Sequence, residues 1–119
     1  MMIIETEIIR YLQTALDTDR VYAEVPEDAS GNFIVIDKTG GGSTDYINTA
    51  TIAVQSYGSS KLRAIELNES VKTAMKDLIF FSDGISDCRL VTDYNFSNIA
   101  KKQHRYQAVF EITHYQEED

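Results

Sequence analysis

Apolar residues that recur at the 3.6-residue period of an α-helix mark the first element of the chain. Ile4, Ile8 and Leu12 form one apolar stripe, followed by Leu16. This spacing predicts a helix from about residue 4 to residue 16 with one face toward a core.

A second and longer helix is expected from about Ser60 to Phe80. Ser60 is a good N-cap residue, and Ser82-Asp83-Gly84 is a typical stop signal. At 100° per residue, the apolar positions fall within an arc of roughly 140°. These positions are Ala64, Leu67, Val71, Ala74, Met75, Leu78 and Ile79.

Five other segments have the patterns of β-strands. The run Phe33-Ile34-Val35-Ile36 predicts a strand that is buried on both faces. Near the end of the chain, Tyr106, Ala108, Phe110 and Ile112 alternate with more polar residues, as in a half-buried antiparallel strand. The predicted strands comprise residues 20–25, 32–38, 46–57, 88–96 and 105–115. In the fourth of them, simple alternation places Cys88, Leu90, Thr92, Tyr94 and Phe96 on one face.

These elements predict one α+β domain over residues 1–119, in the order α-β-β-β-α-β-β. We expect a mostly antiparallel sheet of about five strands with two helices packed on one face, because each apolar face must be covered by another layer. The long helix and the 106/108/110/112 strand face would supply most of the core. No internal repeat or domain boundary interrupts the pattern.

Charge narrows the classes of function. The chain has 19 acidic and 11 basic residues, which gives a formal net charge of −8. This balance argues against a dedicated nucleic-acid-binding module and against binding to an anionic membrane. The single cysteine, Cys88, favours a reducing compartment, and no signal peptide or membrane-spanning segment is expected.

A glycine-rich loop is expected to join the second and third strands. It comprises Thr39, Gly40, Gly41, Gly42, Ser43, Thr44 and Asp45. A phosphate-binding loop would need a lysine and a following helix, whereas here an acidic residue and a strand follow. The open interpretations are a mobile hairpin tip, a loop that becomes ordered against a partner, and a nucleotide site as a minor alternative.

No group of residues predicts catalysis or metal binding. His104 and His114 would lie more than about 30 Å apart along one strand at 3.4 Å per residue, too far to share a metal. Cys88 has the setting of a small buried apolar residue, and the carboxylate pairs are read as turn residues. We therefore expect no enzymatic activity, no cofactor and no metal.

Two surface features favour contacts with other proteins. The basic turn Lys101–Arg105 is a solvated turn or pairs with an acidic patch on a neighbouring copy. Several tyrosines fall outside the expected core pattern, and tyrosine is common at protein interfaces. They are Tyr46, Tyr57, Tyr94 and Tyr115.

Two segments and the helix after them resemble a known family. They are residues 33–42, with their strand followed by Thr-Gly-Gly-Gly, and residues 51–60, a strand followed by small residues. Ala64 then lies in the first turn of the long helix. This pattern, the order of elements and the length resemble the tail terminator proteins of long non-contractile-tailed bacteriophages, also called tail-completion or tail-to-head joining proteins.

The resemblance implies a structural role in the virion, at the head-proximal end of the tail, after assembly in the host cytoplasm. Members of that family form homo-oligomeric rings, usually hexamers, which cap the tail tube, stop its polymerisation and join the head. The implied partners are further copies of the chain, the major tail-tube protein and the head connector or neck protein, with DNA passing through unbound. The segment 39–45 would then contact a subunit or the tube.

Two alternatives remain open. One is a phage head-completion, neck or minor capsid protein, which would share the small α+β pattern. The other is a small ligand- or nucleotide-binding domain that uses Gly40–Gly42.

Overall fold

The elements of secondary structure follow the predicted order, with one short helix added. The computed structural model describes residues 3–115. Its elements are α1 (Ile4–Ala15), β1 (Val21–Tyr22), β2 (Phe33–Thr44), β3 (Ile47–Gly58), α2 (Lys61–Met75), α3 (Leu78–Phe81), β4 (Ile85–Asn95) and β5 (His104–Tyr115). The first predicted strand is much shorter than expected, because only Val21 and Tyr22 pair with β2.

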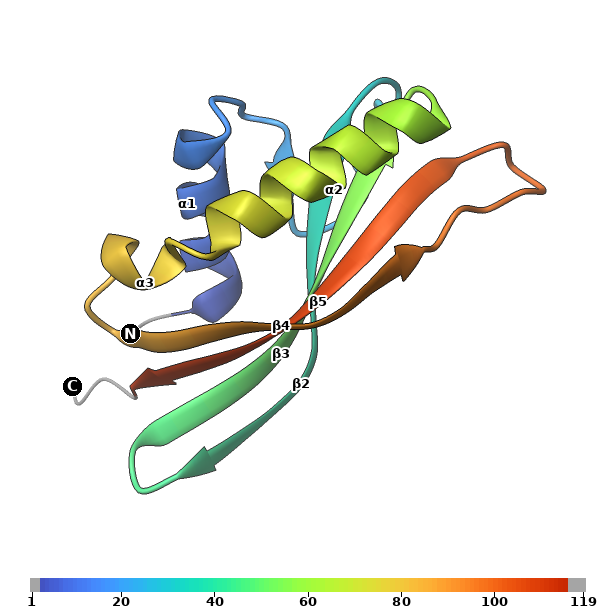
Figure 1. Ribbon diagram of the computed structural model, residues 1–119. Coiled ribbons are helices and arrows are strands. Elements are labelled where there is room, and N and C mark those ends of the chain that lie inside the picture. Colours follow the sequence, from blue (N-terminus) through green and yellow to red (C-terminus); the bar gives the residue numbers. More distant parts are fainter. Residues whose placement is uncertain (1–2, 116–119) are drawn as a thin grey trace.

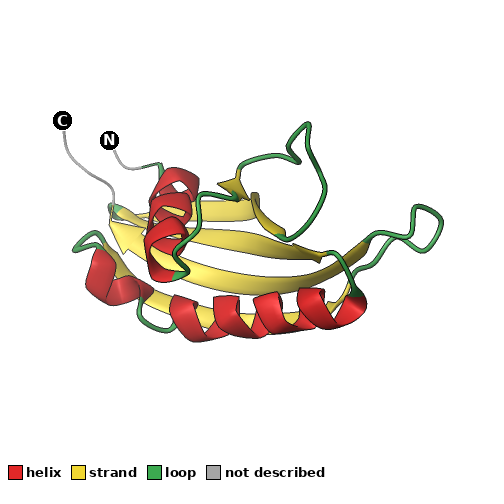
Figure 2. Cartoon of the chain, turned by 90° about the horizontal axis from the view of Figure 1, so that it is seen from above, coloured by secondary structure: helices red, strands yellow, loops and turns green. Residues whose placement is uncertain are grey.

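The strands form one sheet in the spatial order β1-β2-β3-β5-β4 (Figure 1). The pairs among β2, β3, β5 and β4 are antiparallel, and only the short β1 is parallel to its neighbour. All three helices pack on one face of the sheet (Figure 2). The predicted α+β class and the mostly antiparallel five-stranded sheet are confirmed.

The core lies between the helices and this face of the sheet. Its side chains come from the positions that the helical and strand periods predict, including Leu12, Val71 and Phe110. The opposite face, which we call the open face, has no helix over it (Figure 2). There Phe33, Val35 and Tyr57 form a second, smaller buried cluster. The run 33–36 is therefore buried on both faces, as predicted.

The long predicted helix is in fact two helices. α2 ends at Met75, and α3 begins at Leu78 after a short turn. The carbonyl of Ala74 explains the break, because it accepts the backbone N–H of Asp77 at 3.0 Å and the hydroxyl of Tyr11 at 2.6 Å. This tighter i→i+3 bond ends the α-helix and returns Leu78 to the core.

A β-bulge in β4 overturns the expected alternation of residues 88–96. The register of β4 against β5 shifts between Leu90 and Thr92, so Val91 is the extra residue. Cys88 and Leu90 lie opposite the core residues Ile112 and Phe110. After the bulge the faces exchange, so that Thr92 and Tyr94 lie on the open face rather than with Cys88 and Leu90.

The same bulge brings Asp93 beneath α2. Asp93 accepts hydrogen bonds from the Asn68 amide at 3.3 Å and from the Lys72 ammonium at 3.4 Å. Lys72 also pairs with Glu69 at 2.8 Å. Asn68 is itself buried, because its position lies within the apolar arc of the helix although its side chain is polar. These contacts fasten the edge strand β4 to the helix layer.

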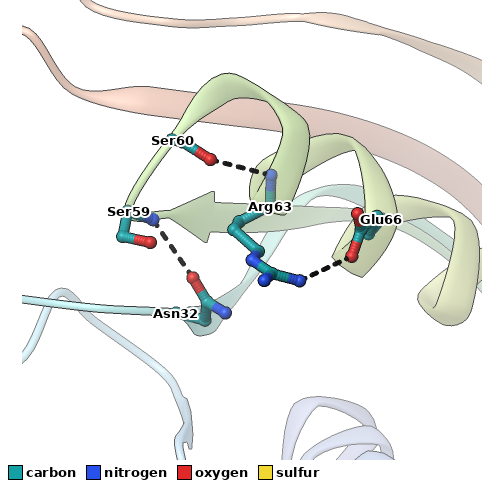
Figure 3. Close-up of polar contacts among 5 residues, drawn as sticks. All are labelled: Asn32, Ser59, Ser60, Arg63 and Glu66. Atoms are coloured by element: carbon teal, nitrogen blue, oxygen red, sulfur yellow. Dashed lines mark hydrogen bonds and ion pairs between the residues drawn. The ribbon is translucent and has the colours of Figure 1, made fainter.

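At the junction of β3 and α2, the backbone of the helix lies directly against the end of the strand. A Cβ atom on Gly58 would lie 2.3 Å from the backbone nitrogen of Ala64 and 2.8 Å from its Cα. Around this contact, Ser60 caps the N–H of Arg63 at 3.2 Å, and Asn32 accepts the N–H of Ser59 at 3.1 Å (Figure 3). Because Gly58 and Ala64 are both small, α2 can begin directly at the end of β3.

We expect Gly58→Ala to lower the free energy of unfolding by about 1–3 kcal/mol or more, because the added methyl group must displace backbone atoms. Urea denaturation measures the loss. Gly40→Ala is the matched control, because a Cβ there would lie 3.7 Å from the nearest atom. Equal stabilities of the two variants would contradict the steric role of Gly58.

Candidate assembly surface

The β2–β3 hairpin extends beyond the helix layer at one end of the molecule, and the β4–β5 hairpin extends at the other (Figure 1). Residues 37–47, which include the tip of the first hairpin, are all exposed. The predicted contact segment 39–45 therefore lies on a projecting, solvent-facing arm. Exposure of this kind is suited to contacts with another protein.

The prediction of a flexible loop at residues 39–45 is wrong. Residues 39–44 belong to β2, and the pairing with β3 continues to the pair Thr44 and Ile47. The connection is a two-residue turn, Asp45-Tyr46, in which both φ angles are positive, at 51° and 66°. This is the type I′ turn, whose twist matches that of paired strands. The run of glycines predicts a loop, whereas pairing with β3 holds these glycines in a strand.

The three glycines differ in their surroundings. A Cβ atom on Gly41 would meet the carbonyl oxygen of Thr49 at 2.9 Å and Lys38 at 3.0 Å, so the hairpin requires glycine there. Gly40 and Gly42 have ordinary van der Waals room, at 3.7 and 3.4 Å from the nearest atoms. None of the three has a positive φ. The extended, paired backbone differs from the curled loop that surrounds a phosphate.

Both sides of the sheet end in a strand that pairs on one side only. β1 pairs with Ile34 and Val35 of β2, so within the described chain residues 37–44 of β2 pair only with β3. At the other side, β4 pairs only with β5 among residues 3–115. Exposed apolar side chains lie on β4, among them Leu90 and Val91. Two long edges are therefore available for pairing with another chain.

Side chains on the open face are joined into a continuous polar and aromatic network. The ring of Phe33 stacks on that of Tyr57, with centroids 4.4 Å apart. Arg105 donates to the Tyr57 hydroxyl at 2.9 Å, and its guanidinium lies 4.4 Å from the centroid of Phe96. These contacts connect β2, β3 and β5 to the end of β4, and they make this part of the open face a firm surface.

Two glutamines continue the network across the sheet. The Tyr57 hydroxyl donates to the side-chain amide oxygen of Gln55 at 3.2 Å. The Gln55 amide nitrogen donates to the side-chain oxygen of Gln107 at 2.9 Å, and the Gln107 amide nitrogen donates to the Tyr94 hydroxyl at 2.5 Å. The amides are thereby bonded to one another rather than presented to a ligand.

Of the four tyrosines predicted outside the core, Tyr46, Tyr94 and Tyr115 are exposed, and Tyr57 is buried on the open face. The sequence contains a signal for this network, since Gln55 and Gln107 lie at directly paired positions of β3 and β5, but that pairing is not evident before the strand register is known.

The basic turn is placed as predicted, between two strands. Lys101 and Lys102 are exposed there, with φ positive at 52° for Lys102. A small cleft of about 240 Å³ lies beside them and extends to Gly31 and Ser59. Arg105, by contrast, belongs to the aromatic network of the open face and is not a free surface charge.

The residues considered for metal binding or catalysis lie apart. His104 and His114 lie at opposite ends of the unbroken strand β5. The part of the chain that the structure describes contains no group of three or more His, Cys, Asp or Glu residues that could hold a metal ion. Among the same residues, no helix is long and apolar enough to cross a membrane. Burial, together with the charge of Asp87, raises the pKa of Cys88 to about 12.

Comparisons with known proteins give a likeness of fold. No protein-family model matches the sequence, and no curated protein matches it. The structure is similar to a chain of a solved structure described as the virion of a native gene transfer agent (GTA) particle, with a TM-score of 0.58 and 14% identity. The match covers 94% of this chain and 94% of that chain. It therefore extends to the whole arrangement of helices and sheet.

The pKa of Cys88 predicts slow alkylation. Because a thiol must lose its proton to react, a rise from 9.0 to about 12 reduces the reactive fraction about a thousandfold near pH 8. We expect iodoacetamide to modify the native chain far more slowly than the chain unfolded in urea, as followed by mass spectrometry. Equal rates would show that the thiol is accessible and ordinary.

Stability is expected to depend on the titration of His114. Burial, then the charge of Lys38, lowers its pKa below 6.5, while a hydrogen bond with the Tyr115 backbone and the charge of Glu5 act in the opposite sense. As the pH falls, the unfolded chain therefore binds a proton at a higher pH than the folded chain does. The contribution of His114 to the free energy of unfolding is fully present above pH 6.5 and is lost as the pH drops toward the lower folded pKa. Urea denaturation at pH 7.5 and 5.5 measures this fall, which His114→Gln should reduce. An unchanged fall in the variant would assign it to other groups.

Proposed function

We propose that this chain is a non-enzymatic structural protein of a phage-like virion, and specifically a tail terminator. In this role a homo-oligomeric ring, most simply a hexamer, caps the tail tube, stops its polymerisation and provides the surface that joins the head. The observation that carries the proposal is the end-to-end likeness of fold to a chain of a gene transfer agent virion. The sequence resemblance of residues 33–42 and 51–60 to tail terminators supports the same assignment.

The shape of the molecule supports assembly. A ring subunit must contact neighbours on two sides and other components above and below. The sheet has two free edges, and hairpins project beyond the helix layer at both ends of the molecule (Figure 1). In this proposal the exposed arm 37–47 contacts a neighbouring subunit or the tail tube. The partners are further copies of the chain, the major tail-tube protein and the head connector.

The chemistry of the surface also supports a structural role. Cys88, the one thiol, has a pKa of about 12 and is a poor nucleophile at neutral pH. The amides of Gln55 and Gln107 on the open face bond to each other and to tyrosines. With a net charge of −8, the chain is suited to a ring that DNA passes without binding.

The neighbouring role of a head-completion, neck or minor capsid protein is the second candidate, because the likeness to a virion chain supports it equally. A nucleotide-binding domain that uses Gly40–Gly42 has less support. These glycines are paired in β2, and the turn that follows carries Asp45. An anionic side chain at this position repels phosphate.

Deletion of the gene tests the assignment. We expect tails of abnormal length that fail to join heads, as seen by electron microscopy, and rescue by the gene supplied in trans. Full-length unattached tails together with defective heads would instead support the neck role. Normal infectious virions from the deletion would contradict both roles.

A further inference from the structure

The two free edges of the sheet belong to strands that run in opposite directions. Each neighbouring pair in the series β2, β3, β5, β4 is antiparallel, so β2 and β4 are antiparallel to each other. A copy rotated about an axis along the strands keeps these directions. Its β2 would then lie antiparallel beside the β4 of the first copy and continue the pattern of the sheet.

The edge of β2 is unusually bare. Gly40 and Gly42 have room for a side chain and no positive φ, so the fold of the single chain does not require glycine at either position. Glycine inside a strand is destabilising and often marks a bulge, a bend or the close approach of another backbone. The register shift of β2 lies next to Gly40, whereas Gly42 lies beyond it and is the stronger sign of a close approach. Both residues lie on the open face, in line with Thr51 and Thr49 of β3.

The edge strand β4 carries large exposed side chains, which the glycine-containing edge of β2 lacks. Tyr94 lies on the open face, and Leu90 lies on the helix side, and both are exposed. A large side chain on one strand packs well over glycine on the next. The free stretch of β2 carries one acid and one base, Asp37 and Lys38, so its net charge is zero and does not repel β4.

Bulges in both strands favour a closed assembly. β2 has a register shift between Lys38 and Gly40, and β4 has shifts between Ile85 and Asp87 and between Leu90 and Thr92. Bulges bend and twist strands, and curved sheets use them to close. The helices cover only one face, so they can lie outside such a curve.

We propose that copies of this chain join edge to edge, with residues 37–44 of β2 in one copy pairing antiparallel with β4 of the next. This inference rests on the proposed ring and names the surfaces that form it. Each contact uses two different edges, so it is heterologous and closes a ring by rotation rather than forming a two-fold dimer. The open face, with its glutamine and tyrosine network, then lines the inside.

One substitution blocks each edge. Thr44 and Ile47 flank the two-residue turn and form a hydrogen-bonded pair, so at the next pair the N–H of Ser43 points away from β3. Ser43→Pro removes this outward donor, and Ser43→Ala is the matched control. On the other edge, Val91→Lys places a charge on the exposed bulge of β4, as natural edge strands do to prevent pairing.

The test compares oligomeric state by light scattering at millimolar concentration and by electron microscopy, with thermal melts to confirm folding. We expect rings from the wild type and Ser43→Ala, and monomers from Ser43→Pro and from Val91→Lys. Mixed in equal amounts, the two blocked variants should form a heterodimer, because each retains the edge that the other lacks.

The outcomes separate this inference from the proposed function. Rings that survive both substitutions, or a mixture that stays monomeric, would overturn the edge pairing and leave the terminator role intact. Symmetric dimers from Ser43→Pro alone would point to pairing of β4 with itself and would also overturn it. A wild-type chain that stays monomeric both alone and on tail tubes would overturn the ring, and the edge pairing with it.

Discussion

The contact between Gly58 and Ala64 sets the position of α2, and much of the remaining structure depends on it. With no side chain on Gly58 and a single methyl group on Ala64, the first turn of the helix lies against the last residue of β3. α2 then crosses β3 and β5, and its middle reaches Asp93 on the edge strand. At its far end, Ala74 meets Tyr11 of α1. One close approach thus aligns the helix layer over the sheet.

The two faces of the sheet are built on different principles. The helix side is an apolar core, where burial of aliphatic side chains supplies the stability. The open face is held by stacked rings and side-chain hydrogen bonds that connect neighbouring strands, as between Gln55 and Gln107. Such a face is firm without a covering layer. It allows the strands to extend beyond the helices, where they are available to other chains.

Simple periodicity predicted the fold well because most of the core residues repeat at regular intervals. The α1 stripe, the buried run 33–36 and the alternation in β5 all depend on local pattern alone. The errors occur where a nonlocal contact changes the local rule. The Ala74 carbonyl divides the long helix, and the bulge at Val91 exchanges the faces of β4. In the candidate site, glycines read as a loop are held in a strand by pairing with β3.

The setting of Cys88 also determines how readily the chain takes part in redox chemistry. A thiol with a pKa of about 12 stays protonated at physiological pH, so it exchanges slowly with disulfides and oxidises slowly. In the proposed role, such a thiol lets the chain pass from a reducing cell interior to an oxidising medium without linking covalently to its neighbours. Its contacts would remain non-covalent and reversible on both sides of that passage.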